Sequence, residues 1–188
     1  NFGNLEPRVA VSYQLNDNAS VKASYNRMAQ YLHLISNTAS PTPLDVWTPS
    51  DNWIKPQLLD QYAVGYFRNF ENDAWSLETE AFYKTVKNRV DYIDGADLIA
   101  NEAIEQVILS GKSRAYGLEV LLRKNTGALS GWVSYTLSRA EQQTPGRAPG
   151  ETGINNGEWY KTGFDKLHNL AIVANYKWTE KWRFSANL

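Results

Sequence analysis

The hydrophobic and polar positions of this chain alternate with a period of two over most of its length. The longest apolar stripe consists of Leu170, Ile172, Ala174, Tyr176 and Trp178. Because successive side chains of a strand point to opposite faces, this period predicts strands with one apolar face rather than helices.

The alternation predicts an all-β fold class. We expect eight strands, at residues 6–15, 19–28, 58–70, 75–90, 112–124, 129–141, 167–178 and 182–188. Most of them reach the ~9–11 residues that a tilted strand needs to cross a bilayer. The sequence therefore predicts an antiparallel up-and-down meander of about eight long strands, part of a transmembrane β-barrel.

The connections between these strands alternate strictly between short and long. Short turns rich in Asn, Asp and Gly, residues that tolerate positive φ, lie at 16–18, 71–74, 125–128 and 179–181. Long loops lie at 29–57, 91–111 and 142–166. Outer-membrane barrels have short periplasmic turns and long extracellular loops, so we expect the first strand to run toward the periplasm.

Composition adds two constraints. The chain has 19 basic and 20 acidic side chains and a net charge of −1, which gives no electrostatic reason to expect a nucleic-acid partner. It has no cysteine, which excludes disulfides and thiolate metal sites. Seven Trp and eleven Tyr make it rich in aromatic residues, as expected of a barrel with interfacial aromatic girdles.

Several segments resemble those of a known family. Residues 111–127 read GKSRAYGLEVLLRKNTG, and residues 130–139 read SGWVSYTLSR. Weaker matches occur at 5–8, at 81–92 and at 165–170. In this order the segments resemble the barrel strands of TonB-dependent receptors, and the subgroup with a carboxypeptidase-regulatory-like domain is the nearest in pattern.

The resemblance implies a location in the Gram-negative outer membrane and import of a scarce ligand of the siderophore, glycan or peptide class. Barrels of this family have about 22 strands around a plug. The implied partners are the lipid bilayer, the plug domain and remaining strands of the same polypeptide, TonB through an N-terminal box, and a small-molecule or oligomeric ligand. We expect the present chain to be a fragment of such a barrel, without plug or box.

The sequence offers little support for catalysis, a metal site or a cofactor. Glu78 and Glu80 lie on one strand face and could serve glycoside hydrolysis. We interpret them instead as lumen-facing charges that pair with other lumen charges or with a plug, because barrel interiors are polar. Asp165 near His168 indicates a strand-entry hydrogen bond, and the acidic residues at 91, 94 and 97 lack EF-hand spacing. We therefore predict that the chain is not an enzyme.

Aromatic residues in the long loops are the candidate ligand-binding residues: Trp47, Trp53, Trp159 and Tyr160. Aromatic faces stack on siderophores, sugars and peptides. The competing interpretation is an upper girdle in the lipid headgroups. Both stay open for Trp159 and Tyr160, whereas binding is slightly favoured for Trp47 and Trp53.

Two other classes of protein share the strand pattern. A soluble eight-stranded barrel of the lipocalin type would point the same apolar stripes inward. A small stand-alone outer-membrane barrel could act as an adhesin or structural protein, since eight strands can close on themselves. Neither class accounts for the segments at 111–127 and 130–139.

Overall fold

The computed structural model describes residues 3–35, 46–92 and 108–188. Eight strands form one continuous meander: β1 (Arg8–Asn16), β2 (Ala19–Gln30), β5 (Gln57–Phe70), β6 (Trp75–Tyr92), β7 (Ile108–Lys124), β8 (Leu129–Gln143), β10 (His168–Lys177) and β11 (Arg183–Asn187). The fold class expected from the sequence is confirmed. No helix in the described ranges has the length and apolar character needed to span a membrane.

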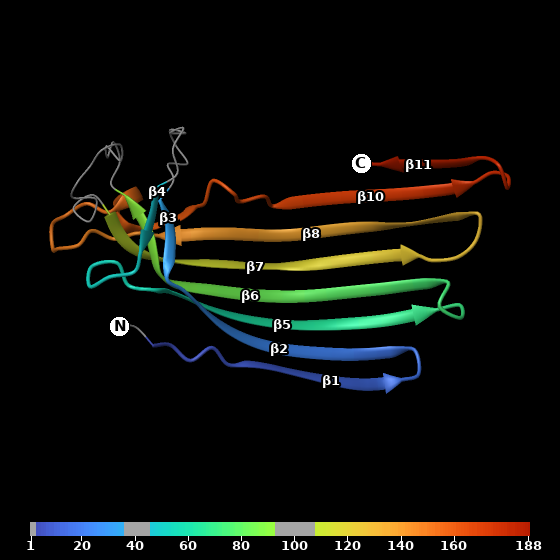
Figure 1. The fold of residues 1–188 in the computed structure, drawn as a ribbon, viewed down its shortest axis with the longest axis horizontal. Helices are drawn as coiled ribbons and strands as arrows, with labels where there is room; N and C mark the ends of the chain where they lie inside the picture. Colours follow the sequence, from blue (N-terminus) through green and yellow to red (C-terminus); the bar gives the residue numbers. More distant parts are fainter. Residues whose placement is uncertain (1–2, 36–45, 93–107) are drawn as a thin grey trace.

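The sheet follows the order β1-β2-β5-β6-β7-β8-β10-β11, with every neighbouring pair antiparallel. Figure 1 shows the tight turns gathered at one end of the strands and the long connections at the other. Short and long connections therefore alternate along the sheet, as the sequence predicts.

The register defines two chemically different faces, because cross-strand partners project from the same side. One row across the sheet is apolar: Val11, Ala23, Val64, Ala81, Leu118 and Leu137. The next row, on the opposite face, is largely polar: Ser12, Lys22, Gly65, Glu80, Glu119 and Thr136. We call these the outward face and the luminal face.

Aromatic pairs border the outward face at both ends of the strands. Toward the long connections, the ring centroids of Tyr25 and Tyr62 lie 5.1 Å apart and those of Tyr83 and Tyr116 6.3 Å apart. At the turn end, Phe184 lies 6.2 Å from Trp178. This arrangement matches the two interfacial girdles of a membrane barrel.

The tight turns use the backbone conformations that their residues predict. Glu71, Asn72 and Asp73 have φ of 50°, 52° and 66°, and Gly127 has φ of 98°. Left-handed conformations are tolerated best by Gly, Asn and Asp, so Asn72, Asp73 and Gly127 suit these two chain reversals, whereas Glu71 adopts the same conformation without that preference.

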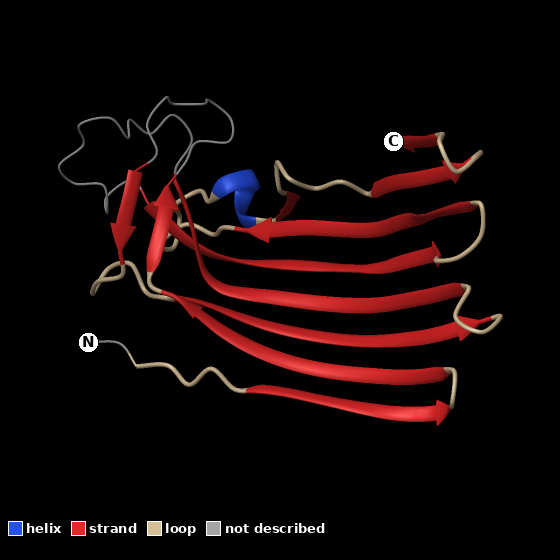
Figure 2. Ribbon diagram, turned by 45° about the vertical axis from the view of Figure 1, so that its right-hand side comes forward, coloured by secondary structure: helices blue, strands red, loops and turns tan. Residues whose placement is uncertain are grey.

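The long connections contain strands that the periodicity did not reveal. A hairpin of β3 (Leu32–Ile35) and β4 (Val46–Pro49) lies within 29–57, and β9 (Trp159–Lys161) pairs with β8 within 142–166. These strands have three or four residues, too few for a period of two to be recognised. Figure 2 shows the hairpin standing across the ends of the long strands. The acidic positions 94 and 97 lie outside the described residues.

A candidate ligand-binding mouth

A β-bulge at Asn88 determines which side chains face the lumen at the loop end of β6. Asn88 has φ of 57°, and the register of β6 against β7 shifts between Lys87 and Arg89. Before the bulge, odd-numbered residues of β6 face outward, whereas after it Arg89 pairs with Gly111 and faces the lumen. The Asn88 side chain donates a hydrogen bond to the carbonyl of Pro56 at 2.8 Å, which holds the bulge against the chain entering β5.

A chain of hydrogen bonds links Arg89 to the β3–β4 hairpin. The Arg89 guanidinium donates to Gln57 Oε1 at 3.4 Å, and Gln57 Nε2 donates to His33 Nδ1 at 3.0 Å. His33 Nδ1 is thereby an acceptor, so the ring proton lies on Nε2, which donates to Ser50 Oγ at 2.8 Å. His33 is fully buried, and these bonds fix the hairpin over the luminal side of the wall.

A second network surrounds Asp91, which also follows the bulge. Tyr160 donates from its hydroxyl to Asp91 Oδ2 at 2.8 Å, and Gln142 Nε2 donates to the same oxygen at 2.8 Å. Thr144 Oγ1 lies 2.9 Å from the Tyr160 hydroxyl and 3.2 Å from Gln142 Nε2. The closed ring connects β6, β8 and β9, and it holds the connection after β8 against the wall.

The environment of both networks favours neutral rings. Burial, followed by the nearby charge of Arg89, lowers the pKa of the His33 imidazole below its usual value. Burial raises the pKa of the Tyr160 phenol above its usual range; the hydrogen bond from Thr144 opposes that rise, and Asp91 adds to it. At neutral pH, both residues therefore act as fixed hydrogen-bonding groups rather than as charges.

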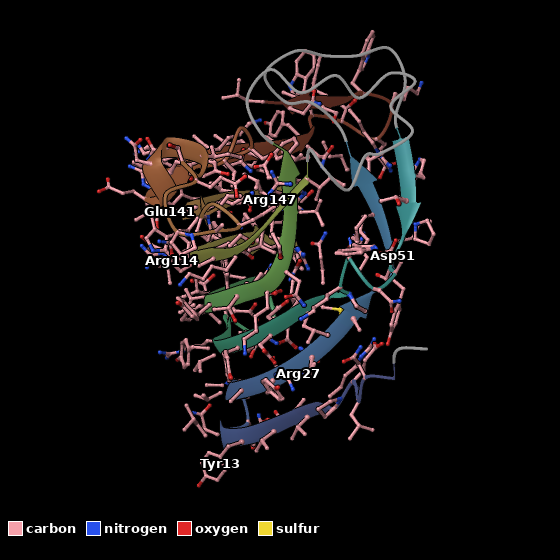
Figure 3. The ribbon with its side chains drawn as sticks, turned by 90° about the vertical axis from the view of Figure 1, so that its left-hand side faces the viewer. Tyr13, Arg27, Asp51, Arg114, Glu141 and Arg147 are labelled. Atoms are coloured by element: carbon pink, nitrogen blue, oxygen red, sulfur yellow. The ribbon has the colours of Figure 1, made fainter. Side chains whose placement is uncertain are left out.

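The four aromatic residues predicted to bind ligand occupy three different environments. Trp47 in β4 and Trp53 after it are 57% and 80% exposed, on or beside the hairpin. Figure 3 shows that hairpin on the side of the sheet away from Arg114 and Glu141, which is the luminal side. The side chains of Trp47 and Trp53 are thus accessible, and their role in ligand binding stays a prediction.

Trp159 and Tyr160 lie on opposite faces of the wall. Tyr160 pairs with Gln142 on the luminal face, whereas Trp159 pairs with Gln143 and projects outward. The Arg114 guanidinium lies 4.1 Å from the Trp159 ring centroid, a cation–π contact. The turn just before β9 has left-handed backbone at Asn155, Asn156 and Gly157, with φ of 51°, 57° and 74°. This turn brings Trp159 and Tyr160 alongside β8.

The sequence reading missed the polar residues of the mouth. His33, Gln57, Gln142 and Thr144 are all buried. Strict alternation along β6 would place Arg89 on the outward face, because nothing in the pattern indicates a bulge. The one available signal was an Asn between two basic residues, Lys87 and Arg89, near the end of a long strand, which is a setting in which bulges re-aim side chains.

The structure also shows how the other residues considered for chemistry are arranged. Glu80 lies directly opposite Glu119 on the luminal face, so the register brings like charges together there. In residues 3–35, 46–92 and 108–188, no group of three acidic or histidine side chains is arranged to hold a metal ion. His168 Nδ1 bonds to the Tyr135 hydroxyl at 2.7 Å, and Asp165 accepts from Arg139 at 2.9 Å, so the expected bond between His168 and Asp165 is replaced by two others.

The comparison with protein families decides to which class of protein this sheet belongs. The family described as TonB dependent receptor-like, beta-barrel matches residues 1–188. The chain belongs to this family. Its outward apolar face is therefore the lipid-facing wall of a Gram-negative outer-membrane receptor barrel, and the lipocalin-like alternative is excluded.

Solved structures of receptors share this fold. The ferric-catecholate import receptor Fiu of E. coli matches with a TM-score of 0.66 and 18% identity, over 98% of this chain and 24% of that chain. The ferripyoverdine receptor of Pseudomonas aeruginosa matches with a TM-score of 0.66 and 17% identity, over 100% of this chain and 22% of that chain. The FrpB iron transporter of Neisseria meningitidis matches with a TM-score of 0.60 and 15% identity, over 92% and 24%. The chain spans about a quarter of their length, and no curated protein sequence matches it.

Proposed function

We propose that this chain forms barrel wall and extracellular mouth in a TonB-dependent receptor that imports a ferric siderophore. The chain contributes binding surface and scaffold, with no catalytic step of its own. The observation that carries the proposal is the bulge at Asn88, which turns Arg89 from the lipid side to the luminal side, where Gln57 and His33 link it to the hairpin that carries the exposed Trp47. An arginine on the same side of the wall as exposed indoles suits an anionic iron chelate with planar aromatic rings.

The iron chelate is favoured over the other ligand classes by the solved relatives, whose names refer to a ferric catecholate, ferripyoverdine and iron. Glycans are the second candidate, because Trp47 and Trp53 are exposed in the manner of sugar-stacking residues. Transport coupling would require the plug and TonB. The plug also offers a source of cations for Glu80 and Glu119, which lie opposite each other on the luminal face.

The test is uptake by the full-length receptor in iron-starved cells. We would measure uptake of ⁵⁵Fe loaded on a catecholate and on a hydroxamate siderophore, with wild type, Arg89→Gln and Trp53→Ala. Arg123→Gln is the matched control, because Arg123 pairs with Ser76 on the same luminal face at the turn end. We expect uptake of one siderophore to fall at least tenfold in Arg89→Gln and to be unchanged in Arg123→Gln.

Two outcomes would contradict this assignment. Wild-type receptor that supports uptake of neither siderophore, but supports oligosaccharide uptake in a Trp53-dependent manner, would establish the glycan alternative. Equal loss in Arg89→Gln and Arg123→Gln, at equal receptor abundance, would show that the loss reflects barrel charge rather than the mouth.

A further inference from the structure

Trp53 is the most exposed tryptophan of the chain, yet the residues that follow it are well packed. Its side chain is 80% exposed, whereas Ile54 beside it is 4% exposed and Pro56 is buried. Exposure of a large apolar side chain is common on protein surfaces and carries no argument by itself. What distinguishes Trp53 is that the backbone beneath its exposed indole is fixed.

The side chain of Asp51 closes the turn that carries Trp53. Asp51 Oδ1 accepts hydrogen bonds from the backbone N–H groups of Trp53 and Ile54, both at 2.7 Å. The backbone N–H of Asp51 donates to the carbonyl of Ile54 at 3.0 Å. An Asp side chain forms such an Asx turn by taking the place of a backbone acceptor. Because these bonds restrain the backbone, the indole retains only the freedom of its own two χ angles.

The turn is joined at both ends to the network that holds Arg89. Before the turn, Ser50 Oγ lies 2.8 Å from His33 Nε2. After it, Gln57 donates to His33 Nδ1 at 3.0 Å and accepts from Arg89 at 3.4 Å. The turn that carries Trp53 and the guanidinium of Arg89 therefore belong to one hydrogen-bonded unit at the mouth.

The turn lies on the side of the wall away from the lipid. Figure 3 shows Asp51 on the opposite side of the sheet from Arg114 and Glu141, which lie on the outward side. Aromatic rings at a membrane interface anchor a barrel among the lipid headgroups. A turn on the luminal side has no headgroups to contact, so the exposed ring of Trp53 instead suits stacking on a ring of a ligand.

We propose that Asp51 is a positioning residue that holds the Trp53 indole in place to stack on a flat ring of the imported ligand. The inference rests on the proposed function, because it describes how one contact of the mouth is prepared. A catechol of a ferric siderophore and the apolar face of a sugar both supply this stacking chemistry. A turn that is ordered before binding spares the free energy of ordering it on binding, which increases affinity.

The first test measures the mobility of the indole in the full-length receptor without ligand. Fluorotryptophan is incorporated at position 53 alone, and the ¹⁹F linewidth is recorded in detergent, because a ring that moves faster than the particle tumbles gives a narrower line. We expect Asp51→Ala to narrow the line at least twofold. Asp51→Asn retains the acceptor oxygen, and Asn52→Ala removes an exposed neighbouring side chain of the same turn. Both of these control variants should keep the wild-type linewidth.

The second test separates positioning of Trp53 from general support of the mouth. Equilibrium binding of a ⁵⁵Fe-loaded catecholate siderophore, and separately of radiolabelled maltoheptaose, is measured with the full-length receptor in energy-depleted cells. For the probe that binds, Asp51→Ala should weaken binding roughly three- to tenfold, because the contact must then be ordered on binding. The same substitution in a Trp53→Ala receptor should cause no further loss, since Asp51 acts through the indole. Asp51→Asn should bind at least as tightly as wild type.

Two results would overturn the proposal. Equal ¹⁹F linewidths in wild type and Asp51→Ala would show that the turn does not restrain the indole. The same loss of affinity from Asp51→Ala with and without Trp53 would make Asp51 a general support of the mouth. Binding of maltoheptaose but not of the catecholate would contradict the ferric-siderophore assignment, and the role of Asp51 would be decided on the sugar. The linewidth measurement needs no ligand, so it decides the role of Asp51 even if neither probe binds.

Discussion

The hydroxyl of Tyr160 donates a hydrogen bond of 2.8 Å to the carboxylate of Asp91, across 69 residues of sequence. Asp91 reaches this position only because the bulge at Asn88 precedes it, and Tyr160 only because β9 pairs with β8. This single bond therefore joins the loop end of β6 to the long connection between β8 and β10 at the mouth of the lumen.

Replacing Tyr160 by Phe should loosen the connection that leads to β9. The substitution keeps the ring but removes the bond to Asp91 and the partner of Thr144. Leaving a partly buried carboxylate with fewer donors costs about 1–3 kcal/mol. We expect faster protease cleavage within 144–161 of the membrane-embedded receptor. The control is Tyr176→Phe, whose side chain is exposed on the outward face; this variant should be cleaved at the wild-type rate. Identical cleavage rates for the two variants would show that the hydrogen bonds of Tyr160 do not hold this connection.

Substitutions of Asn88 should follow the backbone requirement of the bulge. Gly tolerates φ of 57° and loses only the hydrogen bond to Pro56, whereas a β-branched residue adds a left-handed penalty of about 1–2 kcal/mol. Barrel stability toward urea should thus fall in the order wild type, Asn88→Gly, Asn88→Val. A Val variant as stable as the Gly variant would show that the strand is regular at this position in the membrane.

Acidification should release the β3–β4 hairpin through His33. Its folded pKa is lowered from 6.5, so the neutral ring stabilises the docked hairpin above pH 6.5, and this contribution is lost as pH falls through the folded pKa. Protonated Nδ1 cannot accept from Gln57 and repels Arg89. Protease sensitivity of the hairpin should rise between pH 7.5 and pH 5 in wild type and stay constant in His33→Gln. The same pH dependence in both would place the titrating group elsewhere.

Neighbouring positions on β10 test the assignment of the two faces. Ile172 pairs with Val133 on the outward face, and Val173 pairs with Trp132 on the luminal face. Ile172→Arg should cost about 2–4 kcal/mol near the membrane midplane and reduce the assembled receptor in the outer membrane. Val173→Arg should assemble normally. Normal assembly of Ile172→Arg would reverse the orientation of the sheet.

The long strands could be predicted because each is held by a repeated pattern. In β10, four apolar residues at alternate positions indicate the lipid face, and Asn72 and Gly127 indicate the turns that precede β6 and β8. The signal is strong because lipid penalises every polar residue placed on that face. Alternation therefore predicted the architecture, and the family segments at 111–127 and 130–139 were needed to distinguish a membrane barrel from a soluble one.

The mouth could not be predicted in the same way. One extra residue at Asn88 exchanges the faces of Arg89 and Asp91, and alternation contains no mark of where a bulge occurs. His33 forms hydrogen bonds with Ser50 and Gln57, which are 17 and 24 residues away in the sequence. Ser and Gln are common in solvated loops, so their residue types did not indicate a buried network. The aromatic candidates were found by residue type, whereas only the pairing of β9 distinguishes luminal Tyr160 from outward Trp159.

The most direct test of the central claim is an immunoblot of fractionated cells with an antibody against this segment. If the segment is the wall of an outer-membrane receptor, the antibody should detect a band several times larger than 21.3 kDa in the outer-membrane fraction, since the solved relatives are about four times as long. A band near 21 kDa in the soluble fraction would contradict the account, because its apolar face would then have no lipid to contact.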